Sequence, residues 1–320
     1  IIYDDVDNKP YPHFMYPNDA RLRNMNYGLT IYYDIEAEFI YKDEQGQIVN
    51  STTIIPNIYL GKFPIMIQSN YCILNGLTKD VRYNLGECRN DYGAYFIIDG
   101  KEKVIVSQEK FADNMIYVKK HKKDDIFNFS AEVRSVSEDV SKPIRYTSVR
   151  MMAPDTKYTN HQIVVDIPNV RKPVPLFILM RALGVISDKN IIETCLLNIE
   201  KNELYVDFFI PSIHDARQVF NQMNALQFIA SFTKRQTITS AWDILTNYFL
   251  PHVGEDNYLD KAYYIGYMVF KVLKVFNNQD QPTDRDSFKF KRVDTSGQLL
   301  SSLFREYFII QNKNIALQLD

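Results

Sequence analysis

Asp284 and Asp286 have the clearest spacing for metal chemistry in this sequence, because two acids one residue apart can share a hard cation. Arg285 stands between them, and the basic run KFKR follows at residues 289–292. Carboxylates surrounded by so many cations more often form ion pairs than a metal site. The spacing therefore favours a positioned ion-pair network, with a metal site or a metal-dependent nuclease as the alternative.

Other catalytic patterns are missing from the sequence. GxxxxGK[ST], GxGxxG, GxSxG and HExxH do not occur, so the usual support for nucleotide-cradling loops, dinucleotide folds, serine hydrolases and zinc proteases is lacking. The five histidines are scattered without metal-ligand spacing and are interpreted as structural or surface residues. Cys72, Cys88 and Cys195 form no CxxC pair, so we expect reduced, partly buried thiols in a reducing compartment.

Two basic stretches are more informative. Residues 101–123 contain seven lysines and three acids, a local charge of +4, and residues 271–292 carry a local +3. A solvated charged face is the simplest interpretation of either stretch. The alternative is a surface that binds phosphates, which requires such clusters of Lys and Arg.

Length and composition limit the class of protein. The chain has 320 residues, 46% hydrophobic and 24% charged residues and a net charge of −2, which is typical of globular proteins and fits two domains. No apolar run approaches the roughly 20 residues that span a bilayer, so we expect a soluble protein. The chain begins with Ile1 instead of Met and has no signal-peptide pattern, which predicts a segment of something longer.

Strands are predicted in the first half of the chain. Apolar residues alternate over 28–41, and the Gln45-Gly46 turn leads to a second run at 48–55, which indicates a hairpin. The sequence YFIIDGKEKVIV at 95–106 predicts another hairpin, because Asp-Gly supplies the positive φ angles of a tight turn. Short alternating runs between 126 and 166 predict a compact β-rich region.

Helices are predicted in the second half, where the apolar period changes. Gly184 ends the first predicted helix, and Ser187 can cap the next one. Early strands and late helices predict an α+β fold with mixed β-sheet and helices. The predicted helices cover residues 175–183, 187–196, 215–232, 241–250, 259–276 and 298–310.

Several motifs occur in order along about 300 residues. They are PNDARLRNMNY at 17–27, GKFPIM at 61–66, SNYC at 69–72, GAYFIIDGKEKV at 93–104, RALG at 181–184, FLPHVG at 249–254, KAYYIGYM at 261–268 and DRD at 284–286. Together these motifs resemble the N-terminal part of the second-largest (β-like) subunit of multisubunit DNA-directed RNA polymerase. The resemblance is closest to the eukaryotic type, and the Asn-, Tyr- and Ile-rich composition resembles a version from a large DNA virus.

The resemblance implies two domains that form one wall of the cleft for DNA and RNA–DNA hybrid. A discontinuous protrusion would comprise 1–110 and 260–320, with the lobe, 111–259, inserted. Magnesium would be held by the largest subunit, and zinc by the C-terminal part of the family's subunit, with no cofactor in this segment. The segment would lack catalytic residues of its own.

The resemblance also implies the residues nearest to nucleic acid, as well as the partners. The partners would be the largest and smaller polymerase subunits, template DNA, RNA–DNA hybrid and transcription factors, with no membrane. The location would be the nucleus or, for a virus, host cytoplasm or virion. Arg21 and Arg23 are expected to tie the protrusion's own turns together. The expected nucleic-acid-binding residues are Lys101, Lys103, Gln108, Lys110, Asp286, Lys291 and Arg292.

A free-standing viral interaction or accessory module with the same fold and no catalysis is the alternative function. The mass of the intact polypeptide discriminates the two, because a subunit is much longer than this chain. An independent nuclease using Asp284 and Asp286 would require metal-dependent cleavage, and we expect none.

Overall fold

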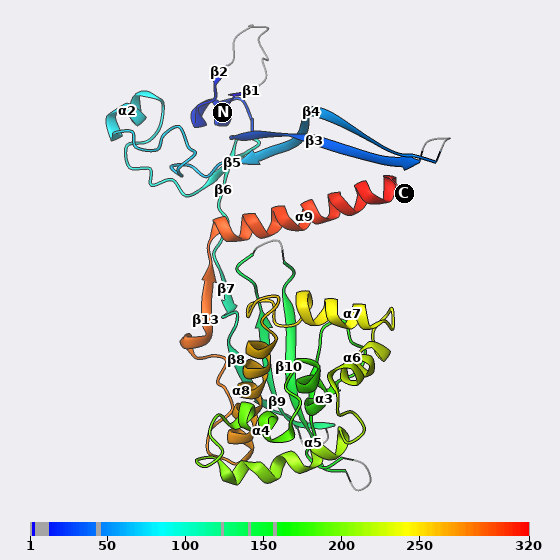
Figure 1. Cartoon of the computed structure of the whole chain (residues 1–320). Coiled ribbons are helices and arrows are strands. Elements are labelled where there is room, and N and C mark those ends of the chain that lie inside the picture. Colours follow the sequence, from blue (N-terminus) through cyan, green and yellow to red (C-terminus); the bar gives the residue numbers. More distant parts are fainter. Residues whose placement is uncertain are drawn as a thin grey trace. The chain divides into compact units, whose positions relative to one another are not determined.

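The computed structural model describes residues 2–3, 13–42, 46–122, 125–139, 142–155 and 159–319 (Figure 1). Contacts within the chain divide it into two compact units. The first unit combines Ile1–Gln108 with Thr295–Asp320, and the inserted unit is Glu109–Asp294. Gln45 of the predicted turn and Lys123 of the first basic stretch lie outside the described residues. No helix within the described ranges is long and apolar enough to cross a membrane.

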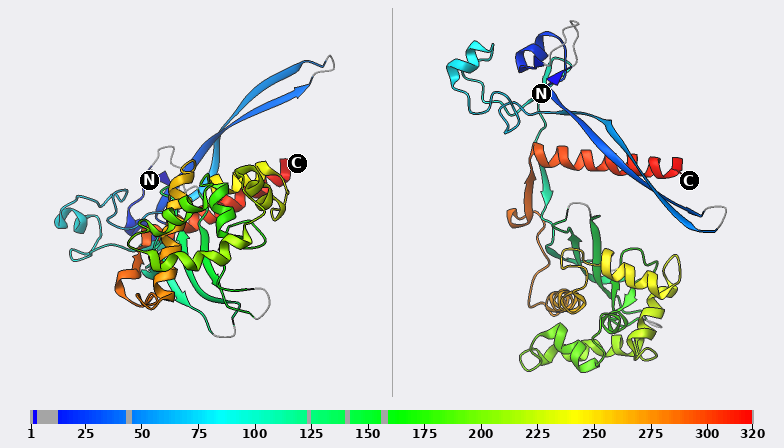
Figure 2. Two further views of the ribbon diagram at one scale, coloured as in Figure 1. Left: turned by 60° about the horizontal axis from the view of Figure 1, so that its bottom comes forward. Right: turned by 45° about the horizontal axis from the view of Figure 1, so that its top comes forward.

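A five-stranded sheet forms one layer of the inserted unit, with the order β12-β11-β10-β9-β8 and antiparallel pairing throughout (Figure 2). Its inward residues alternate along the chain, as in β10, where Thr147, Val149 and Met151 are buried. This alternation confirms the β-rich region predicted over 126–166. The strands are β8 (Ile116–Lys120), β9 (Phe127–Ser135), β10 (Arg145–Met152), β11 (Ile163–Asp166) and β12 (Val174–Pro175).

Helices form the second layer of the inserted unit. Two of them, α3 (Leu176–Ala182) and α8 (Tyr258–Phe276), pack on the sheet, and α4 (Asp188–Leu196) packs on α8. Gly266 makes the α4–α8 approach possible, because a Cβ there would lie 2.7 Å from the Thr194 carbonyl oxygen. The remaining elements are η1 (Glu203–Phe209, a 3-10 helix), α5 (Ile210–Asp215), α6 (Gln222–Ser231), α7 (Ile238–Asp243), η2 (Ile244–Tyr248, a π-helix) and η3 (Phe288–Phe290, a 3-10 helix).

The helix α8 belongs to the inserted unit, whereas our domain prediction placed residues from 260 onward in the discontinuous domain. Apolar residues of α8 join the large buried cluster beneath the sheet, and the chain returns to the first unit only at Thr295. The physical reason is the apolar face of α8, including Ile265, Met268 and Val269, which is fully buried against α4 and β9.

The first unit contains a long antiparallel ribbon of β3 (Gly28–Lys42) and β4 (Ile48–Pro64), as the alternation at 28–41 predicted. The hairpin predicted around Asp99-Gly100 is also present, with φ angles of 50° and 72° at these residues. Other elements are β1 (Ile2–Tyr3), β2 (His13–Phe14), α1 (Pro17–Leu22), α2 (Lys79–Asn84), β5 (Phe96–Ile98), β6 (Lys101–Lys103) and α9 (Ser296–Leu319).

A polar clamp around Arg21 joins separate segments of the first unit. The Arg21 guanidinium donates to Glu87 Oε1 at 2.8 Å, to Glu102 Oε1 at 2.9 Å and to the Tyr95 hydroxyl at 2.6 Å. The Tyr95 hydroxyl in turn donates to Asp91 Oδ2 at 2.5 Å. These contacts confirm the structural role predicted for Arg21, because they connect α1 to the 87–95 loop and to β6.

Three details of the predicted elements were wrong. Val104 and Val106, predicted as strand, are exposed and irregular, because β6 ends at Lys103. The helix predicted from Asp215 begins only at Gln222, because α5 ends at Asp215 and a turn follows at 216–218. Ser187 does precede α4, but its side chain makes no capping hydrogen bond. The overall α+β class is as predicted.

Candidate nucleic-acid interface

The two basic stretches meet within the inserted unit. Strand β7 (Gln108–Phe111) pairs with β13 (Lys291–Asp294) in a two-stranded sheet. Further along, the Val118 amide donates to Thr283 Oγ1 at 2.9 Å, and the Thr283 amide donates to the Val118 carbonyl at 2.8 Å. Lysines from residues 110–120 therefore lie beside cations from residues 283–292, although the stretches are far apart in sequence.

Lys110 and Lys291, both predicted to contact nucleic acid, are held by acids of this small sheet. Lys110 Nζ lies 2.8 Å from Asp294 Oδ1 and 3.4 Å from Asp113 Oδ2. Lys291 Nζ lies 2.8 Å from Glu109 Oε1. The hydrogen bond to Asp294 raises the pKa of Lys110, and the one to Glu109 raises the pKa of Lys291. The paired carboxylates therefore offset much of the charge that each lysine could offer to a phosphate.

The acidic pair at 284–286 forms no metal centre in the structure. Arg285 pairs with Glu132 at 2.8 Å, and the exposed Asp286 carboxylate lies 3.9 Å from Lys291 Nζ. Among the described residues, no group of three or more His, Cys, Asp or Glu side chains could hold a metal ion. Arg292, another predicted contact, is exposed and donates to the carbonyl oxygen of Lys291 at 2.7 Å.

Two adjoining hollows lie along β8 and the 280–290 segment. The smaller, of about 340 Å³, is lined by residues that include Lys119, Lys120 and Arg285. The larger, of about 470 Å³, is lined by Lys289 among others, and both include Val118 in their walls. Together they form a cationic groove, a name kept below for the two hollows.

The cationic groove contains lysines that have no acidic partner. Lys119, Lys120 and Lys289 are exposed, and none of them forms an ion pair with another described residue. Lys120 and Lys289 instead lie 5.8 Å and 5.5 Å from the ring centres of Phe129 and Phe290. The charges of these three ammonium groups are therefore not offset by an ion pair with a described residue.

Aromatic side chains line the larger hollow. Tyr264, Tyr267 and Phe290 contribute to its wall. The Tyr264 hydroxyl is buried with no hydrogen-bond partner among the described residues, and burial raises its pKa to about 12. The Tyr264 ring also packs edge-on against His252 at 4.8 Å between ring centres. Cations beside aromatic rings can bind the phosphates and the bases of a nucleic acid.

Lys101 and Lys103, the remaining predicted lysines, belong to the first unit. They lie on the exposed strand β6, where Glu102 between them is engaged by Arg21. Gln108 is exposed at the start of β7. The predicted site residues are thus divided between the two units, with Lys110, Asp286, Lys291 and Arg292 together in the inserted one.

Lys119, Lys120 and Lys289 were not among the residues predicted to bind nucleic acid. The signal was present, because Lys119 and Lys120 lie in the first basic stretch with no acid directly beside them, unlike Lys110, which follows Glu109. What the sequence could not show is that Asp294, far along the chain, also neutralises Lys110.

Comparison with known proteins identifies the family. The family model described as RNA polymerase beta subunit matches residues 3–320. The chain is 35% identical over 305 residues to DNA-directed RNA polymerase II subunit 2 of Arabidopsis thaliana, with 92% of this chain and 26% of the relative covered. It is 36% identical over 315 residues to DNA-directed RNA polymerase II subunit RPB2 of Encephalitozoon cuniculi, covering 96% and 26%.

An archaeal relative is similar at almost the same level. DNA-directed RNA polymerase subunit Rpo2 of Saccharolobus shibatae is 32% identical over 313 residues, with 95% of this chain and 26% of the relative covered. The chain thus spans about a quarter of the length of the curated relatives it matches. Because the match extends over nearly every residue, the chain belongs to the RNA polymerase beta subunit family, as a segment of its second-largest subunit.

Proposed function

We propose that this chain works as part of the second-largest subunit of a DNA-directed RNA polymerase, where it forms a wall that holds nucleic acid during DNA-templated RNA synthesis. The observation that carries the proposal is the cationic groove, in a chain that matches the family over residues 3–320. A polymerase must hold nucleic acid of any sequence, so its wall needs cations that bind phosphates and few contacts with base edges.

The groove lysines are the strongest candidates for phosphate contacts. Lys119, Lys120 and Lys289 are exposed and form no ion pair with another described residue. Their full positive charge is therefore available to attract a phosphate. The charges of Lys110 and Lys291 are already offset by paired carboxylates. We therefore rank the groove lysines above those two.

The contacts expected from the family resemblance remain part of the proposal. Lys101 and Lys103 are exposed on β6 and accessible to a polyanion. Asp286 would orient its basic neighbours, and Arg292 would reach phosphate from β13. Gln108 could donate a neutral hydrogen bond at the start of β7.

The rest of the assembly supplies what this segment lacks. By the family resemblance, magnesium would be held by the largest subunit and zinc by the C-terminal part of the family's second-largest subunit. The partners would be the other polymerase subunits, template DNA, RNA–DNA hybrid and transcription factors. Similarity to RNA polymerase II subunits favours the nucleus, with a virus-encoded enzyme in host cytoplasm or virion as the other setting.

A salt titration tests the proposed function. Binding of the chain to a labelled DNA duplex should weaken in the triple variant Lys119→Ala, Lys120→Ala and Lys289→Ala. The slope of log K against log salt should fall by about 2 to 3, since each lost phosphate contact removes about 0.9. Fluorescence anisotropy at several salt concentrations gives both values.

The matched control removes three exposed cations elsewhere in the inserted unit. The variant Lys189→Ala, Lys201→Ala and Arg217→Ala has the same change in net charge and should keep the wild-type slope. Equal losses in the two variants would show that only net charge matters and would contradict the proposal. The double variant Lys291→Ala with Arg292→Ala should reduce the slope less than the groove variant does.

A further inference from the structure

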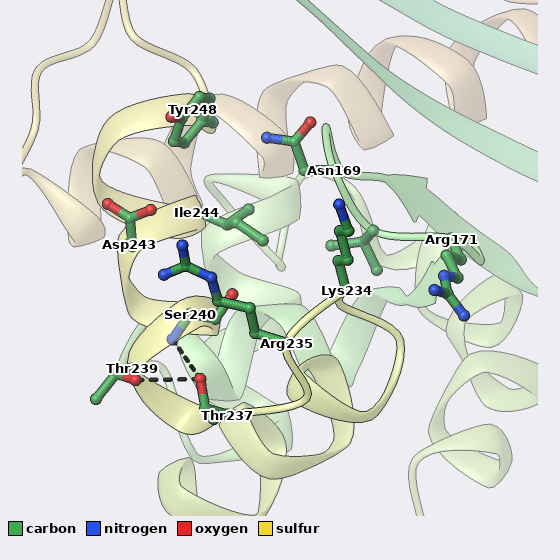
Figure 3. Close-up of a pocket in the computed structure, with 11 residues that line it drawn as sticks. Asn169, Arg171, Lys234, Arg235, Thr237, Thr239, Ser240, Asp243, Ile244 and Tyr248 are labelled. Carbon is green, nitrogen blue, oxygen red and sulfur yellow. Dashed lines mark hydrogen bonds between the residues drawn. The ribbon is translucent and has the colours of Figure 1, made fainter. Parts of the chain in front are cut away.

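A second basic hollow lies in the inserted unit, lined by residues that do not contribute to the cationic groove. It has a volume of about 820 Å³ and is lined by residues 169–171, which follow β11, and by residues from the 234–248 segment, which carries α7 and η2 (Figure 3). None of the residues predicted to bind nucleic acid contributes to its wall.

Three cations surround this hollow. Figure 3 shows Lys234 extending toward Asn169 and Arg235 extending toward Asp243, with Arg171 on the far side of Lys234. All three cations are exposed, and none forms an ion pair with another described residue. The single acid of the lining, Asp243, accepts a hydrogen bond from Asn247 at 2.7 Å.

These cations differ from most other arginines of the inserted unit. Arg134, Arg150 and Arg285 each lie within 2.8 Å of a carboxylate oxygen. Local acids satisfy the charge of those arginines, whereas the charges around the hollow are left to solvent. A concave surface with unpaired cations, in a chain with net charge −2, is complementary to an anionic ligand.

The floor of the hollow is apolar. Ile244 is buried, and Val170 and Tyr248 are half-buried beside it. The Tyr248 ring already faces the Arg145 guanidinium at 5.0 Å, so it is not a free platform for stacking a base. An apolar floor with a cationic rim fits a ligand that carries both an apolar group and negative charges.

The walls are held in place by contacts with the rest of the unit. The Arg171 amide donates to the Phe232 carbonyl at 3.1 Å, and the Gln236 amide donates to Thr233 Oγ1 at 3.1 Å. Next to the lining residue Ile244, the Leu245 carbonyl accepts a hydrogen bond from the buried Lys261 ammonium at 2.7 Å. A wall fixed before binding reduces the ordering cost of recognition.

We propose that this hollow binds an acidic segment of a partner protein, with carboxylate or phosphorylated side chains against Lys234 and Arg235 and an apolar side chain on Ile244. A peptide is favoured over nucleic acid because the cations border a single hollow whose floor is apolar, which suits an apolar side chain flanked by acids. The inference depends on the proposed function in one respect, namely that protein factors bind to this subunit.

The test measures binding of a fluorescein-labelled peptide in which glutamates and aspartates flank one phenylalanine. The double variant Lys234→Glu with Arg235→Glu should weaken binding of this peptide at least about tenfold, because two attractions become repulsions. Replacing the phenylalanine of the peptide by serine should also weaken binding to the wild-type chain. A second peptide, with phosphoserine in place of one glutamate, shows which anion is preferred.

The matched control is Lys201→Glu with Arg217→Glu, which changes net charge equally on other exposed residues. Melting curves of both variants check that they fold. The inference is overturned if Lys234→Glu with Arg235→Glu binds the peptide like wild type, if the control loses as much affinity, or if a DNA duplex displaces the peptide from wild type but not from the groove variant. The peptide and duplex assays change different residues, so failure of one is distinguishable from failure of the other.

Discussion

The two units stabilise themselves by different means. The inserted unit buries one large apolar cluster between its sheet and helices, including Phe177, Phe209 and Phe249. The first unit has a small cluster around Met15, Tyr27 and other residues, and large parts of its β3–β4 ribbon are exposed. Because hydrophobic stabilisation follows the apolar area removed from water, the first unit has less of it to rely on.

Polar side chains have correspondingly different roles in the two units. In the first unit, the Arg21 clamp connects segments that the small core does not join. In the inserted unit, the Lys261 side chain is fully buried. Its ammonium group donates to the carbonyls of Leu245, Thr246 and Glu255 at 2.7, 2.9 and 3.0 Å. The comparison predicts where a single substitution costs most.

The largest effect is expected at Lys261. Lys261→Met should lower the free energy of unfolding of the inserted unit by about 3 kcal/mol, since one buried and two partly buried carbonyls lose a donor. Chemical denaturation followed by tryptophan fluorescence measures it, because Trp242 lies in this unit. Lys271→Met, a half-buried lysine of the same helix, is the control and should change little.

The same lysine gives a pH dependence. Burial lowers the pKa of Lys261 to about 8, whereas an unfolded lysine has a pKa of about 10.4. Between these values the unfolded state binds more protons, so stability rises with pH in this window. The wild type should therefore gain stability relative to Lys261→Met from pH 8 to above pH 10, and a flat difference would contradict this.

A smaller loss of stability is expected for substitution of Arg21, which lies in the first unit. Arg21→Ala should destabilise the first unit by about 2 kcal/mol, because it leaves the buried Glu87 carboxylate unpaired. Hydrogen exchange resolves the two units, and protection should fall in residues 17–103 but not in the inserted unit. Arg89→Ala is the control, because it removes only surface contacts: the exposed 3.6 Å pair with Asp80 and the approach of the guanidinium to the Tyr83 ring at 4.5 Å. Equal losses of protection in both units would contradict the view that the Arg21 contacts stabilise the first unit alone.

The smallest effect on stability is expected at the β7–β13 sheet. Lys291→Ala breaks an ion pair whose partner Glu109 is exposed, so the loss of unfolding free energy should be much smaller than the losses at Lys261 and Arg21. Thermal melting at low and high salt measures it, and the small difference should shrink with salt. A loss comparable to that of Lys261→Met would show that this sheet is a main support of the inserted unit.

Much of the fold could be predicted from local patterns. The alternation at 28–41, the Asp-Gly turn and the long apolar period of 259–276 depend only on neighbours in sequence, and each produced the expected element. The 3-10 helix Glu203–Phe209 was missed because it carries no clear period. The unit to which α8 belongs depends on which surface covers its apolar face. The sequence of the helix shows that the face is apolar but does not show which surface packs against it.

The candidate site was harder to predict, because charge is neutralised by residues far along the chain. In the sequence, Lys110 lies in a basic stretch and is a reasonable candidate to bind phosphate. In the folded chain, Asp294 lies 2.8 Å from its ammonium group and offsets its charge. Lys261 did carry a signal, since it shares the buried face of α8 with Ile265 and Met268 at helical spacing. A lysine on such a face is a candidate for a buried donor.

The interruption of the first unit by 109–294 also has a consequence in time. In this unit, the Phe63 ring meets Phe304 at 5.8 Å, and Ser296 contacts Met66 Sδ at 3.6 Å. During synthesis at about 5–20 residues per second, the ribosome needs on the order of 10–40 s to pass from one piece to the other. During that interval the nascent β3–β4 ribbon lacks its contacts with α9. The inserted unit is synthesised as one continuous segment and can fold before α9 is made.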